Sequence, residues 1–446
     1  MTRAIGPVPL TERLRDGVYA APSENGAIVM AWPRVFAIGD DPADLRRVRQ
    51  LADGLPGGAD DPTTNGLRDD GWLTQEFGDD AGVAFVVRPL RAAAESDVDL
   101  TPDLDLSRFA VIRREGEAFL VESPLASAEI VVHRRALLTD ALSGQGGLAA
   151  ALREALFTHG FLAKPGGAED SELRLRQWAP HELLFHDRSR LGYRGYVGDG
   201  FGGTWWGKKA GFAPERAEPA GFGGARIVLP HVDLAGLRAI DAPFCEVVER
   251  RVSSREHDDS MPIDIAEVGE LLFRTSRVRR VHVEDGVEFV SAPRPSGGSV
   301  YELELYLAVS HCSGLDPAFY HYDSHRHELE VVRDIDDPAV RRMIRVAGQG
   351  STTGAVPQVL IVISARVGRV MWKYEGMGLG VVMKNTGVLY DALALACSAM
   401  GLAGCPLGTD DAVAFSEATG LDPLLECSMG QFIVGSRRHR AAEVVA

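Results

Sequence analysis

Two arginines and a serine occupy alternate positions in a short segment of the second half of the chain. Arg251, Ser253 and Arg255 are each separated by one residue, so in an extended backbone their side chains point to the same side. Two guanidinium groups flanking a hydroxyl can bind a phosphomonoester through charge-assisted hydrogen bonds. The motif alone is also compatible with a solvated charged segment, because Glu256 follows it directly. Arg437, in a Gly-Ser-Arg-Arg sequence, is a second position from which an arginine could reach a phosphate.

Two glycine-containing sequences could bring backbone N–H groups close to a flat ring or an anion. The first is Pro-Ser-Gly-Gly at 295–298, which precedes an alternation of apolar and polar residues typical of a strand. The second is Leu-Gly-Thr at 407–409, which follows a long apolar helix. Each sequence by itself indicates only a turn. The candidate residues are Pro295, Ser296, Gly297, Gly298, Leu407, Gly408 and Thr409.

An adjacent lysine and tyrosine, Lys373 and Tyr374, end an apolar run. Removing water from a lysine ammonium lowers its pKa toward neutrality, and a phenol can donate or relay a proton. The two residues are therefore a candidate pair for proton transfer. The alternative for an isolated Lys-Tyr pair is a lysine at a strand end whose ammonium extends into solvent.

Three histidines and one cysteine could be taken for metal ligands or a nucleophile, but we interpret them as structural residues. His321, His325 and His327 have the spacing of metal ligands, but they lie between two strand-like runs, so a hairpin loop is favoured and no metal is predicted. Cys405 has no histidine near it in the sequence and is interpreted as a turn residue, not a nucleophile. The chain contains no GxxxxGK[ST], GxSxG or HExxH motif.

The composition argues against several classes of partner. Of the 446 residues, 47 are Lys or Arg and 63 are Asp or Glu, so the formal net charge is −16. Nucleic-acid binding needs clustered basic residues and is not expected here, although a local pocket for one phosphate is compatible with this charge. Five cysteines without a CxxC pair predict a reduced, cytoplasmic protein.

Neither a signal peptide nor a membrane span is expected. No apolar run follows the N-terminal charges. The most apolar stretch starts at Val388, carries Asp391 near its start and ends in glycine and proline turn signals, so we interpret it as a buried helix. The apolar run at 359–364 has the length of a strand and is too short to cross a membrane.

The first half of the chain has the pattern of a weak duplication. Each copy has a strand pair, then helices, then a glycine turn with an aromatic residue, and strands are expected at 26–39, 109–123 and 128–133. Helices are expected at 42–55, 136–144 and 148–163. This order is typical of a winged helix, whose groove and sheet edge can accept an extended peptide.

Changes in composition along the chain predict its domains. We expect a winged-helix-like domain at 1–95 and a second winged-helix-like domain for peptide recognition at 96–170. A linker rich in glycine, proline and aromatic residues follows at 171–244. Its aromatic residues suggest that it packs against another part of the protein. A final domain is expected at 245–446, opening with a helix near Pro243.

Taken in chain order, these motifs resemble the flavin-dependent nitroreductase superfamily. Within it they resemble the azoline dehydrogenases of thiazole/oxazole-modified peptide pathways, of the SagB/ThcOx or McbC-like type. The resemblance covers about residues 245 to 440, and the Lys-Tyr pair is its most specific feature, because general nitroreductases lack it at this point. The matching sequences are RVSSR, IAEVGELLF, PRPSGGSVYELELYLAV, GLDPAFYHYD, RVMWKYEG, GLAGCPLG and IVGSRR, and QWAPHELLFHDRSRLG resembles the family's linker.

This resemblance implies the fold class α+β, with a nitroreductase-like FMN domain that forms a homodimer and holds FMN at the dimer interface. Arg251, Ser253 and Arg255 would hold the phosphate and the ribityl chain, and Arg437 would add a phosphate contact. The turn at 295–298 would meet the isoalloxazine, and residues 407–409 would lie near its redox edge. Lys373 and Tyr374 match the family's catalytic pair.

The implied reaction is the oxidation of peptide thiazolines and oxazolines to thiazoles and oxazoles, in the biosynthesis of a ribosomally made, modified peptide. A neutral Lys373 would take the Cα proton with the help of Tyr374, and FMN would accept the hydride. The expected partners are a precursor peptide and, in a complex, a cyclodehydratase. Two alternatives are an NAD(P)H-dependent nitroreductase or quinone reductase, and a non-catalytic scaffold that binds a precursor peptide.

Overall fold

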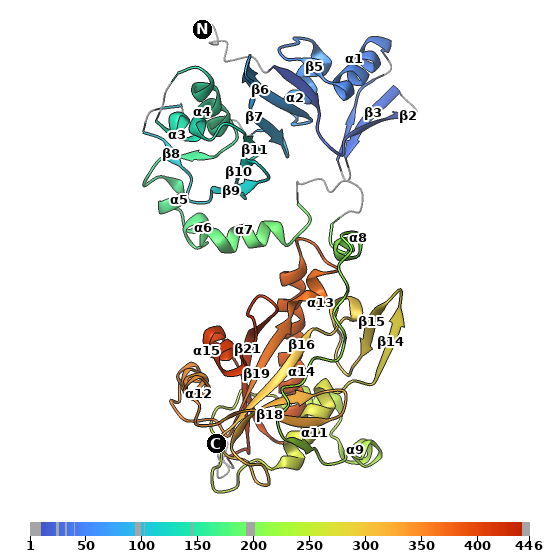
Figure 1. Ribbon diagram of the computed structural model, residues 1–446, viewed down its shortest axis with the longest axis vertical. Coiled ribbons are helices and arrows are strands. Elements are labelled where there is room, and N and C mark those ends of the chain that lie inside the picture. The colour runs from blue at the N-terminus through green and yellow to red at the C-terminus, as the bar shows by residue number, and fades with distance from the viewer. Residues whose placement is uncertain are drawn as a thin grey trace, which may run out of the picture. The chain divides into compact units, whose positions relative to one another are not determined.

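The computed structural model describes residues 10–23, 26–31, 34–39, 41–93, 100–101, 103–143, 146–192 and 201–438 (Figure 1). The chain forms two compact units, Met1–Phe201 and Gly202–Ala446, called the N-terminal and C-terminal units below. The predicted linker at 171–244 is thus divided between the two units. Its residues 193–200 lie outside the described residues.

The N-terminal unit is built on a seven-stranded antiparallel sheet with the strand order β5-β1-β6-β7-β11-β10-β9. Strands β7 and β11 pair from Ala128↔Pro89 to Val132↔Phe85, so the regions predicted as two domains, 1–95 and 96–170, share one sheet. Their winged-helix-like character stays a prediction. The strands are β1 (Thr11–Leu14), β5 (Leu55–Pro56), β6 (Leu73–Asp79), β7 (Gly82–Pro89), β9 (Val111–Glu115), β10 (Ala118–Glu122) and β11 (Ala128–Val132).

Helices and two small sheets complete the N-terminal unit. Helices α1 and α2 begin at prolines that follow Asp41 and Asp61, whose carboxylates accept hydrogen bonds from the first helical turn. The helices are α1 (Pro42–Asp53), α2 (Pro62–Asp69), α3 (Ala136–Leu142), α4 (Leu148–Thr158), α5 (Ala168–Ser171), α6 (Leu173–Arg176) and α7 (Pro180–Arg188). The small sheets are β2 (Tyr19–Ser23) with β3 (Gly26–Ala31) and β4 (Arg34–Ala37), and β8 (Asp105–Leu106) with β12 (Leu162–Ala163).

The C-terminal unit is built on a second seven-stranded antiparallel sheet, with the strand order β13-β18-β17-β16-β19-β21-β20. A separate hairpin consists of β14 (Arg280–Glu284) and β15 (Val287–Ser291). The strands of the large sheet are β13 (Arg226–Val228), β16 (Leu303–Val309), β17 (Ala318–Asp323), β18 (Glu328–Asp334), β19 (Val359–Arg366), β20 (Ala403–Leu407) and β21 (Glu426–Gly435).

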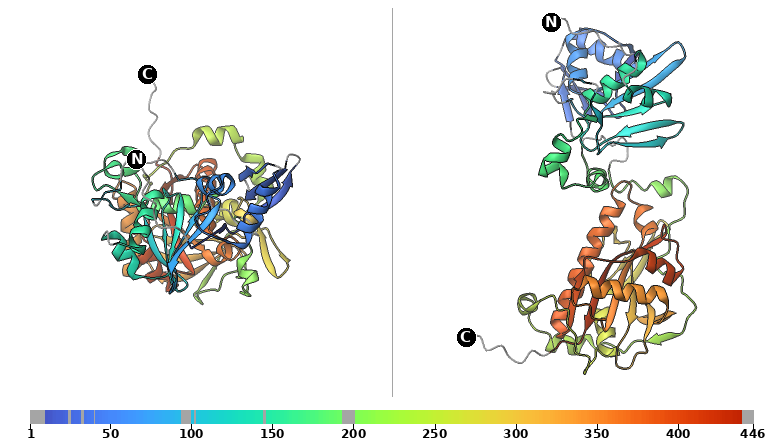
Figure 2. Two further views of the ribbon diagram at one scale, coloured as in Figure 1. Left: turned by 90° about the horizontal axis from the view of Figure 1, so that it is seen from above. Right: turned by 90° about the vertical axis from the view of Figure 1, so that its left-hand side faces the viewer.

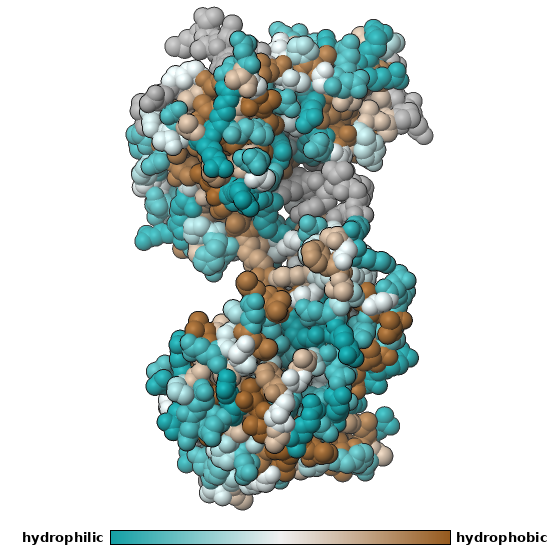
Figure 3. Space-filling model, viewed as in Figure 1, coloured by the Kyte–Doolittle hydropathy of each residue, from teal (hydrophilic) through white to brown (hydrophobic). Residues whose placement is uncertain are grey.

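Helices cover both faces of this sheet, as the two views in Figure 2 allow the reader to follow. Every residue of β16 and β19 is buried, which is why both strands are rich in Leu, Ile and Val. One apolar core joins the sheet to α11 (Ile265–Ser276) and α14 (Gly378–Met400). The other joins it to α12 (Pro338–Gly350) and α15 (Ala412–Thr419). Hydrophilic residues cover much of the surface seen in Figure 3.

Four shorter helices and a 3-10 turn complete the unit. They are α8 (Trp206–Lys209), α9 (Leu234–Ile240), α10 (Phe244–Arg250), α13 (Val367–Met371) and η1 (Gly297–Ser299). The helix expected near Pro243 is confirmed as α10. The buried helix expected after Val388 is confirmed as part of α14, and no helix among the described residues is long and apolar enough to cross a membrane.

Two local predictions need correction. The hairpin predicted around the histidines is present as β17 and β18, but His321 lies inside β17 rather than in the loop. It is buried there, where its ring packs against Tyr306 and bonds Glu304. Cys405 lies in β20 and is buried, so it is a strand residue and not the turn residue predicted. Within the described ranges, no group of three or more His, Cys, Asp or Glu side chains could hold a metal ion.

Candidate active site

The predicted Lys-Tyr pair and the predicted Pro-Ser-Gly-Gly turn meet in the C-terminal unit. Lys373 and Tyr374 follow the short helix α13, which leaves the end of central strand β19. The Lys373 Nζ donates a hydrogen bond to the Gly298 carbonyl oxygen at 3.4 Å. A Cβ added at Gly298 would lie 2.5 Å from the Tyr374 hydroxyl and 3.0 Å from Lys373 Nζ, so a larger residue would displace the ends of both side chains.

The backbone after this turn adopts an uncommon conformation. Gly298, Ser299 and Tyr301 have φ values of 70°, 57° and 48°, in the left-handed region that favours glycine. Each non-glycine residue held there costs about 1–3 kcal/mol, which the surrounding contacts must offset. The Tyr301 hydroxyl donates to the Arg294 carbonyl oxygen at 2.6 Å and fixes the loop.

A buried polar network holds the other end of the turn. The Gly297 N–H donates to Asn385 Oδ1 at 3.1 Å, and Asn385 Nδ2 donates to Glu302 Oε1 at 2.8 Å. Ser296 Oγ donates to the second Glu302 oxygen at 3.3 Å. Burial raises the pKa of Glu302, while the Asn385 hydrogen bond opposes that shift. The network fixes the turn against α14, and its members Asn385 and Glu302 were not singled out in the sequence.

The surroundings of Lys373 and Tyr374 favour their neutral forms. Burial lowers the pKa of Lys373, and no neighbouring charge among the described residues contributes to that shift. Burial raises the pKa of Tyr374. A neutral amine accepts a proton and a neutral phenol donates one, so the pair can both accept and donate a proton.

The arginine-serine motif lines a second region, near the C-terminal end of α14. Its backbone follows β20, because the Ser254 N–H donates to the Gly404 carbonyl oxygen at 3.1 Å. Ser253, Arg255 and Arg437 line a cavity of about 830 Å³, whereas Arg251 is exposed and is not one of its lining residues. The other lining residues are Val252, Ser254, Glu256, Thr353, Gly401 and Arg438.

The arginines of this cavity have the charge that a phosphate needs. In the described part of the chain, none of Arg251, Arg255 and Arg437 forms an ion pair with a carboxylate. Exposed guanidinium groups that form no ion pair with a carboxylate, beside an open cavity, fit a phosphate monoester, the anionic end of FMN. Among the residues that the structure describes, Glu256 is the one acidic group that lines the same cavity.

Leu407, Gly408 and Thr409 lie where β20 ends and the chain turns toward α15. The Tyr390 hydroxyl of α14 donates to the Leu407 carbonyl oxygen at 3.2 Å. Thr409 contacts Gly350 at the end of α12. Among the described residues, no hydrogen bond joins these three residues to Lys373 or Tyr374.

The two regions contact opposite parts of α14. A Cβ added at Gly297 would lie 2.5 Å from Val381 Cγ1, and Asn385 also belongs to this N-terminal part of the helix. Gly401, which caps the other end, lines the arginine cavity. From Asn385 to Gly401 the helix rises by about 24 Å, at 1.5 Å per residue. Within one chain, Lys373 and the arginine cavity are therefore far apart.

Trp205 is a site residue that the sequence analysis did not predict. The centre of its ring lies 4.7 Å from Lys373 Nζ, with Phe289 and Tyr374 at 5.5 Å and 5.3 Å. Trp205 stands in the predicted linker, where the sequence predicted no site residue. The signal in the sequence was the pair of tryptophans at 205–206, in a segment whose aromatic residues were expected to pack.

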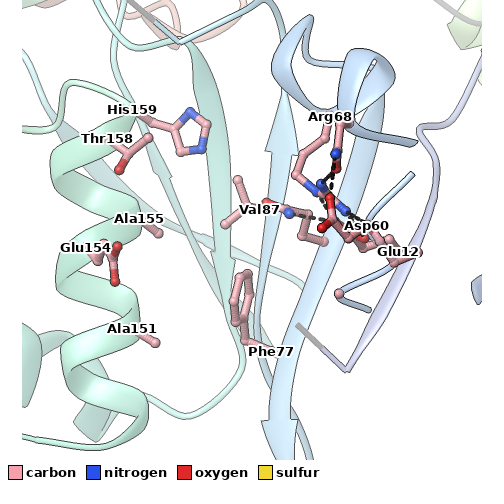
Figure 4. A pocket seen from close by; sticks show the side chains of 14 residues that line it. Glu12, Asp60, Arg68, Phe77, Val87, Ala151, Glu154, Ala155, Thr158 and His159 are labelled. Atoms are coloured by element: carbon pink, nitrogen blue, oxygen red, sulfur yellow. Dashed lines mark hydrogen bonds and ion pairs between the residues drawn. The ribbon is translucent and has the colours of Figure 1, made fainter. Parts of the chain in front are cut away.

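The N-terminal unit contains a cleft of about 410 Å³ between α4 and the strands of its sheet (Figure 4). Ala151 and Ala155 of α4 form one wall, and Phe77 and Val87 lie on the sheet opposite them. The remaining lining residues are Glu12, Gly58, Ala59, Asp60, Asn65, Arg68, Gln75, Glu154, Thr158 and His159.

The polar groups of this cleft differ at its two ends. On one side, Arg68 holds the buried Glu12 through hydrogen bonds of 2.8 Å to both carboxylate oxygens. On the other, His159 bonds Ser127 Oγ at 2.8 Å, and burial lowers the pKa of His159 to about 4. The imidazole is therefore neutral at neutral pH. Glu154 and Thr158 are exposed at the rim.

Comparison with known proteins addresses the C-terminal unit. The profile of the Nitroreductase family matches residues 248–436. A protein of Methanocaldococcus jannaschii, provisionally named a nitroreductase, is 27% identical over 163 residues, which cover 36% of this chain and 77% of that protein. The C-terminal unit thus contains a nitroreductase-family domain, the domain type of flavin-dependent oxidoreductases.

Two solved structures are also similar. A provisionally named nitroreductase of Ralstonia eutropha has 20% identity and a TM-score of 0.38, over 50% of this chain and 94% of that chain. The E. coli microcin synthetase McbBCD complex with truncated pro-MccB17 bound has 19% identity and a TM-score of 0.36, over 48% of this chain and 85% of that chain.

Proposed function

We propose that this protein is an FMN-dependent azoline dehydrogenase that oxidises peptide thiazolines and oxazolines to thiazoles and oxazoles, in the biosynthesis of a ribosomally made, modified peptide. The observation that carries the proposal is the contact of Lys373 and Tyr374 with the Gly297–Gly298 turn, inside a nitroreductase-family domain. Forming the azole removes a proton and a hydride from adjacent ring carbons, so it needs a base beside a hydride acceptor.

The residues that would hold FMN fit its chemistry. Arg255, Arg437 and Ser253 line an open cavity, free of carboxylate ion pairs in the described ranges, and would bind the phosphate. Arg251, exposed beside it, would add charge. The turn at 295–298 would meet the ring through its backbone, and residues 407–409 would lie near the ring's redox edge. Bound there, FMN would supply the acceptor for the hydride.

The residues of the chain itself would handle the proton. Lys373 would take the Cα proton at Nζ, since a half-buried amine with a lowered pKa is neutral in a larger fraction of molecules. Tyr374 would donate or relay a proton from its hydroxyl. The bond from Nζ to the Gly298 carbonyl and the rigid loop after it would keep the amine beside the turn.

A homodimer would complete the site. Along α14 the Gly297 turn and the arginine cavity are about 24 Å apart, a separation that a ribityl chain does not bridge. In a symmetric dimer, the turn and Lys373 of one copy can face the arginines of the second. One FMN would then contact both copies.

The cleft of the N-terminal unit is our proposed binding site for the precursor peptide. Its apolar floor at Phe77 and Val87 suits an apolar side chain, and Glu154 and Asp60 at its rim suit a basic residue. Such a site lets the sequence of a peptide be recognised away from the ring that reacts.

The spectrum of the flavin under anaerobic conditions tests this function. The purified protein, reconstituted with FMN, should lose its visible flavin absorption when a synthetic thiazoline-containing peptide is added. The alternative, an NAD(P)H-dependent nitroreductase or quinone reductase, is favoured by the family match alone and predicts rapid bleaching by NAD(P)H but none by the peptide. A protein that takes up no FMN would support the scaffold and overturn both.

A further inference from the structure

A short segment outside the family-matched region packs against the Lys-Tyr pair. This segment, Gly202–Phe212, is called the strap below, and the nitroreductase profile begins only at residue 248. The Trp205 N–H donates to the Lys373 carbonyl oxygen at 3.0 Å, and the Gly207 N–H donates to that of Trp372 at 3.1 Å. The Glu375 N–H bonds back to the Gly202 carbonyl oxygen at 3.1 Å. The candidate base and the residues on either side of it, Trp372, Lys373 and Glu375, are thus tied to the strap.

Trp205 adopts a backbone conformation that tryptophan rarely has. Its φ is 57°, in the left-handed region, which is strained for a residue with a Cβ. The hydrogen bond to Lys373 holds this conformation, and so does an edge contact of its ring with Trp372, with centres 5.8 Å apart. The conformation turns the indole over Lys373 Nζ.

Three aromatic rings surround this amine. Besides Trp205, they belong to Phe289 on the hairpin strand β15 and to Tyr374. A ring near an ammonium has two opposed effects. It attracts the cation, by about 0.5–1 kcal/mol at exposed sites, and it displaces water that would stabilise the cation. Complete burial can shift a lysine pKa by several units, and burial lowers the pKa of Lys373, so we take the exclusion of water as the larger effect.

We propose that Trp205 is a positioning residue for Lys373: the strap holds its indole over Nζ, where the ring excludes water and keeps the amine beside Gly298. This inference rests on the proposed role of Lys373 as the base. It assigns a function to Trp205, which precedes the residues 248–436 that match the nitroreductase profile.

The effect of Trp205 on the Lys373 amine can be separated from the effects of the charged and titratable groups around it. Tyr374 is beside Lys373, and Glu375 follows it and accepts a weak hydrogen bond from Thr204 Oγ1 at 3.4 Å. Arg369 and Glu215 line a small cavity together with Trp205 and Lys373. His282 stacks on Phe289. None of these groups is removed by a substitution at Trp205.

The proton affinity of Lys373 can be measured without any substrate. The full-length protein is labelled with a trace of an amine-acetylating reagent across a pH series, and acetylation of Lys373 is followed by mass spectrometry. The midpoint reports the pKa of this one amine, whatever its absolute reactivity. Trp205→Gly removes the ring and accepts the positive φ, so the strap backbone is kept. Trp205→Phe keeps a ring.

A neighbouring tryptophan supplies the control. Trp206 belongs to the same strap and bonds the Met371 carbonyl oxygen, but its ring contacts Phe212 rather than Lys373. Trp206→Leu therefore disturbs the strap without uncovering the amine directly.

We expect the Lys373 midpoint to rise by on the order of one pH unit in Trp205→Gly, to stay near the native value in Trp205→Phe, and to be unchanged in Trp206→Leu. A fall in Trp205→Gly would mean that attraction of the cation outweighs the exclusion of water, and no change would mean that Trp205 does not act on the amine. Either result overturns the inference while leaving azoline oxidation, which is tested by peptide turnover, intact. An equal rise in Trp206→Leu would assign the effect to the whole strap and also contradict it.

Discussion

Single residues set the geometry in which Lys373 and Tyr374 can react, and Gly298 is the one with the least freedom. Replacement by alanine would strain its backbone at φ 70° and drive a Cβ to 2.5 Å from the Tyr374 hydroxyl. Gly286→Ala is a matched control, because Gly286 has φ 78° with nothing within 4 Å of its added Cβ.

We expect Gly298→Ala to destabilise the C-terminal unit by more than Gly286→Ala, whose backbone strain is about 1–2 kcal/mol, and to lose most azoline turnover. Urea denaturation and a turnover assay measure the two effects. Equal loss of stability in the two variants, with normal turnover in Gly298→Ala, would mean that the contact with Tyr374 has no role.

At this scale, the sequence identified residues that stand out by type and missed those whose role depends on folding. Lys373 and the turn at Gly297 and Gly298 were singled out separately, and the folded chain brings them together. Asn385 and Glu302 are ordinary polar residues in a helix and beside a strand, and only the folded chain brings them to Gly297 and Ser296. The position of Trp205 over Lys373 depends on a contact between residues 168 positions apart and on an unusual φ. Neither can be predicted from local sequence.

At the scale of elements, the segment 252–256, which hydrogen-bonds to β20, lines the arginine cavity together with residues just beyond the ends of α12, α14 and β21. We expect the double variant Arg251→Ala, Arg255→Ala to weaken FMN binding by at least tenfold, because two phosphate-binding charges are lost. Equilibrium titration of apoprotein with FMN, followed by flavin fluorescence, measures this. Arg341→Ala is the control, since Arg341 lies exposed on α12 and pairs with Asp336. Equal FMN affinity in the double variant and in this control would remove the cavity from the cofactor site.

Helix α4 and strand β11 of the N-terminal unit should respond to acid through His159. Its pKa is about 4 in the folded chain and about 6.5 when unfolded, so between these values the unfolded state binds more protons. Stability present above pH 6.5 is therefore lost as the pH falls toward 4, by at most about 3 kcal/mol. Hydrogen exchange of α4 amides, corrected for the intrinsic effect of pH, should follow this loss.

The variant His159→Gln should flatten that dependence, whereas His181→Gln, at an exposed position on α7, should not. A native pH dependence that persists in His159→Gln would contradict the assignment.

Elements with strong patterns were predictable and their assembly was not. The strand pair around 109–123, the helix at 42–55 and the apolar strand at 359–364 are present as β9 with β10, α1 and β19. The single sheet of the N-terminal unit depends on the pairing of β7 with β11, about 40 residues apart, and periodicity carries no information on such pairing. His321 was predicted to lie in a loop, but β17 continues past it to Asp323. The strand ends only where the polar Asp-Ser sequence begins.

For the whole molecule, the proposed dimer places Lys373 and the arginine cavity of one site on different copies. Lys373→Ala and the double variant Arg251→Ala, Arg255→Ala should each be inactive alone. Mixed under conditions that exchange subunits, they should regain activity, because half of the mixed dimers' sites would have both Lys373 and the arginines. The measurement is peptide turnover after mixing, and no recovery in verified mixed dimers would place the whole site in one chain.

The central claim is that Lys373 is the base for azoline oxidation beside bound FMN. The most direct test incubates wild-type protein and Lys373→Ala, both loaded with FMN, with a thiazoline-containing peptide and follows peptide mass. The account predicts that the wild type removes H₂ from the peptide and that Lys373→Ala binds FMN equally but reacts about 10²–10⁴ times more slowly. Oxidation by the variant at the wild-type rate would contradict it.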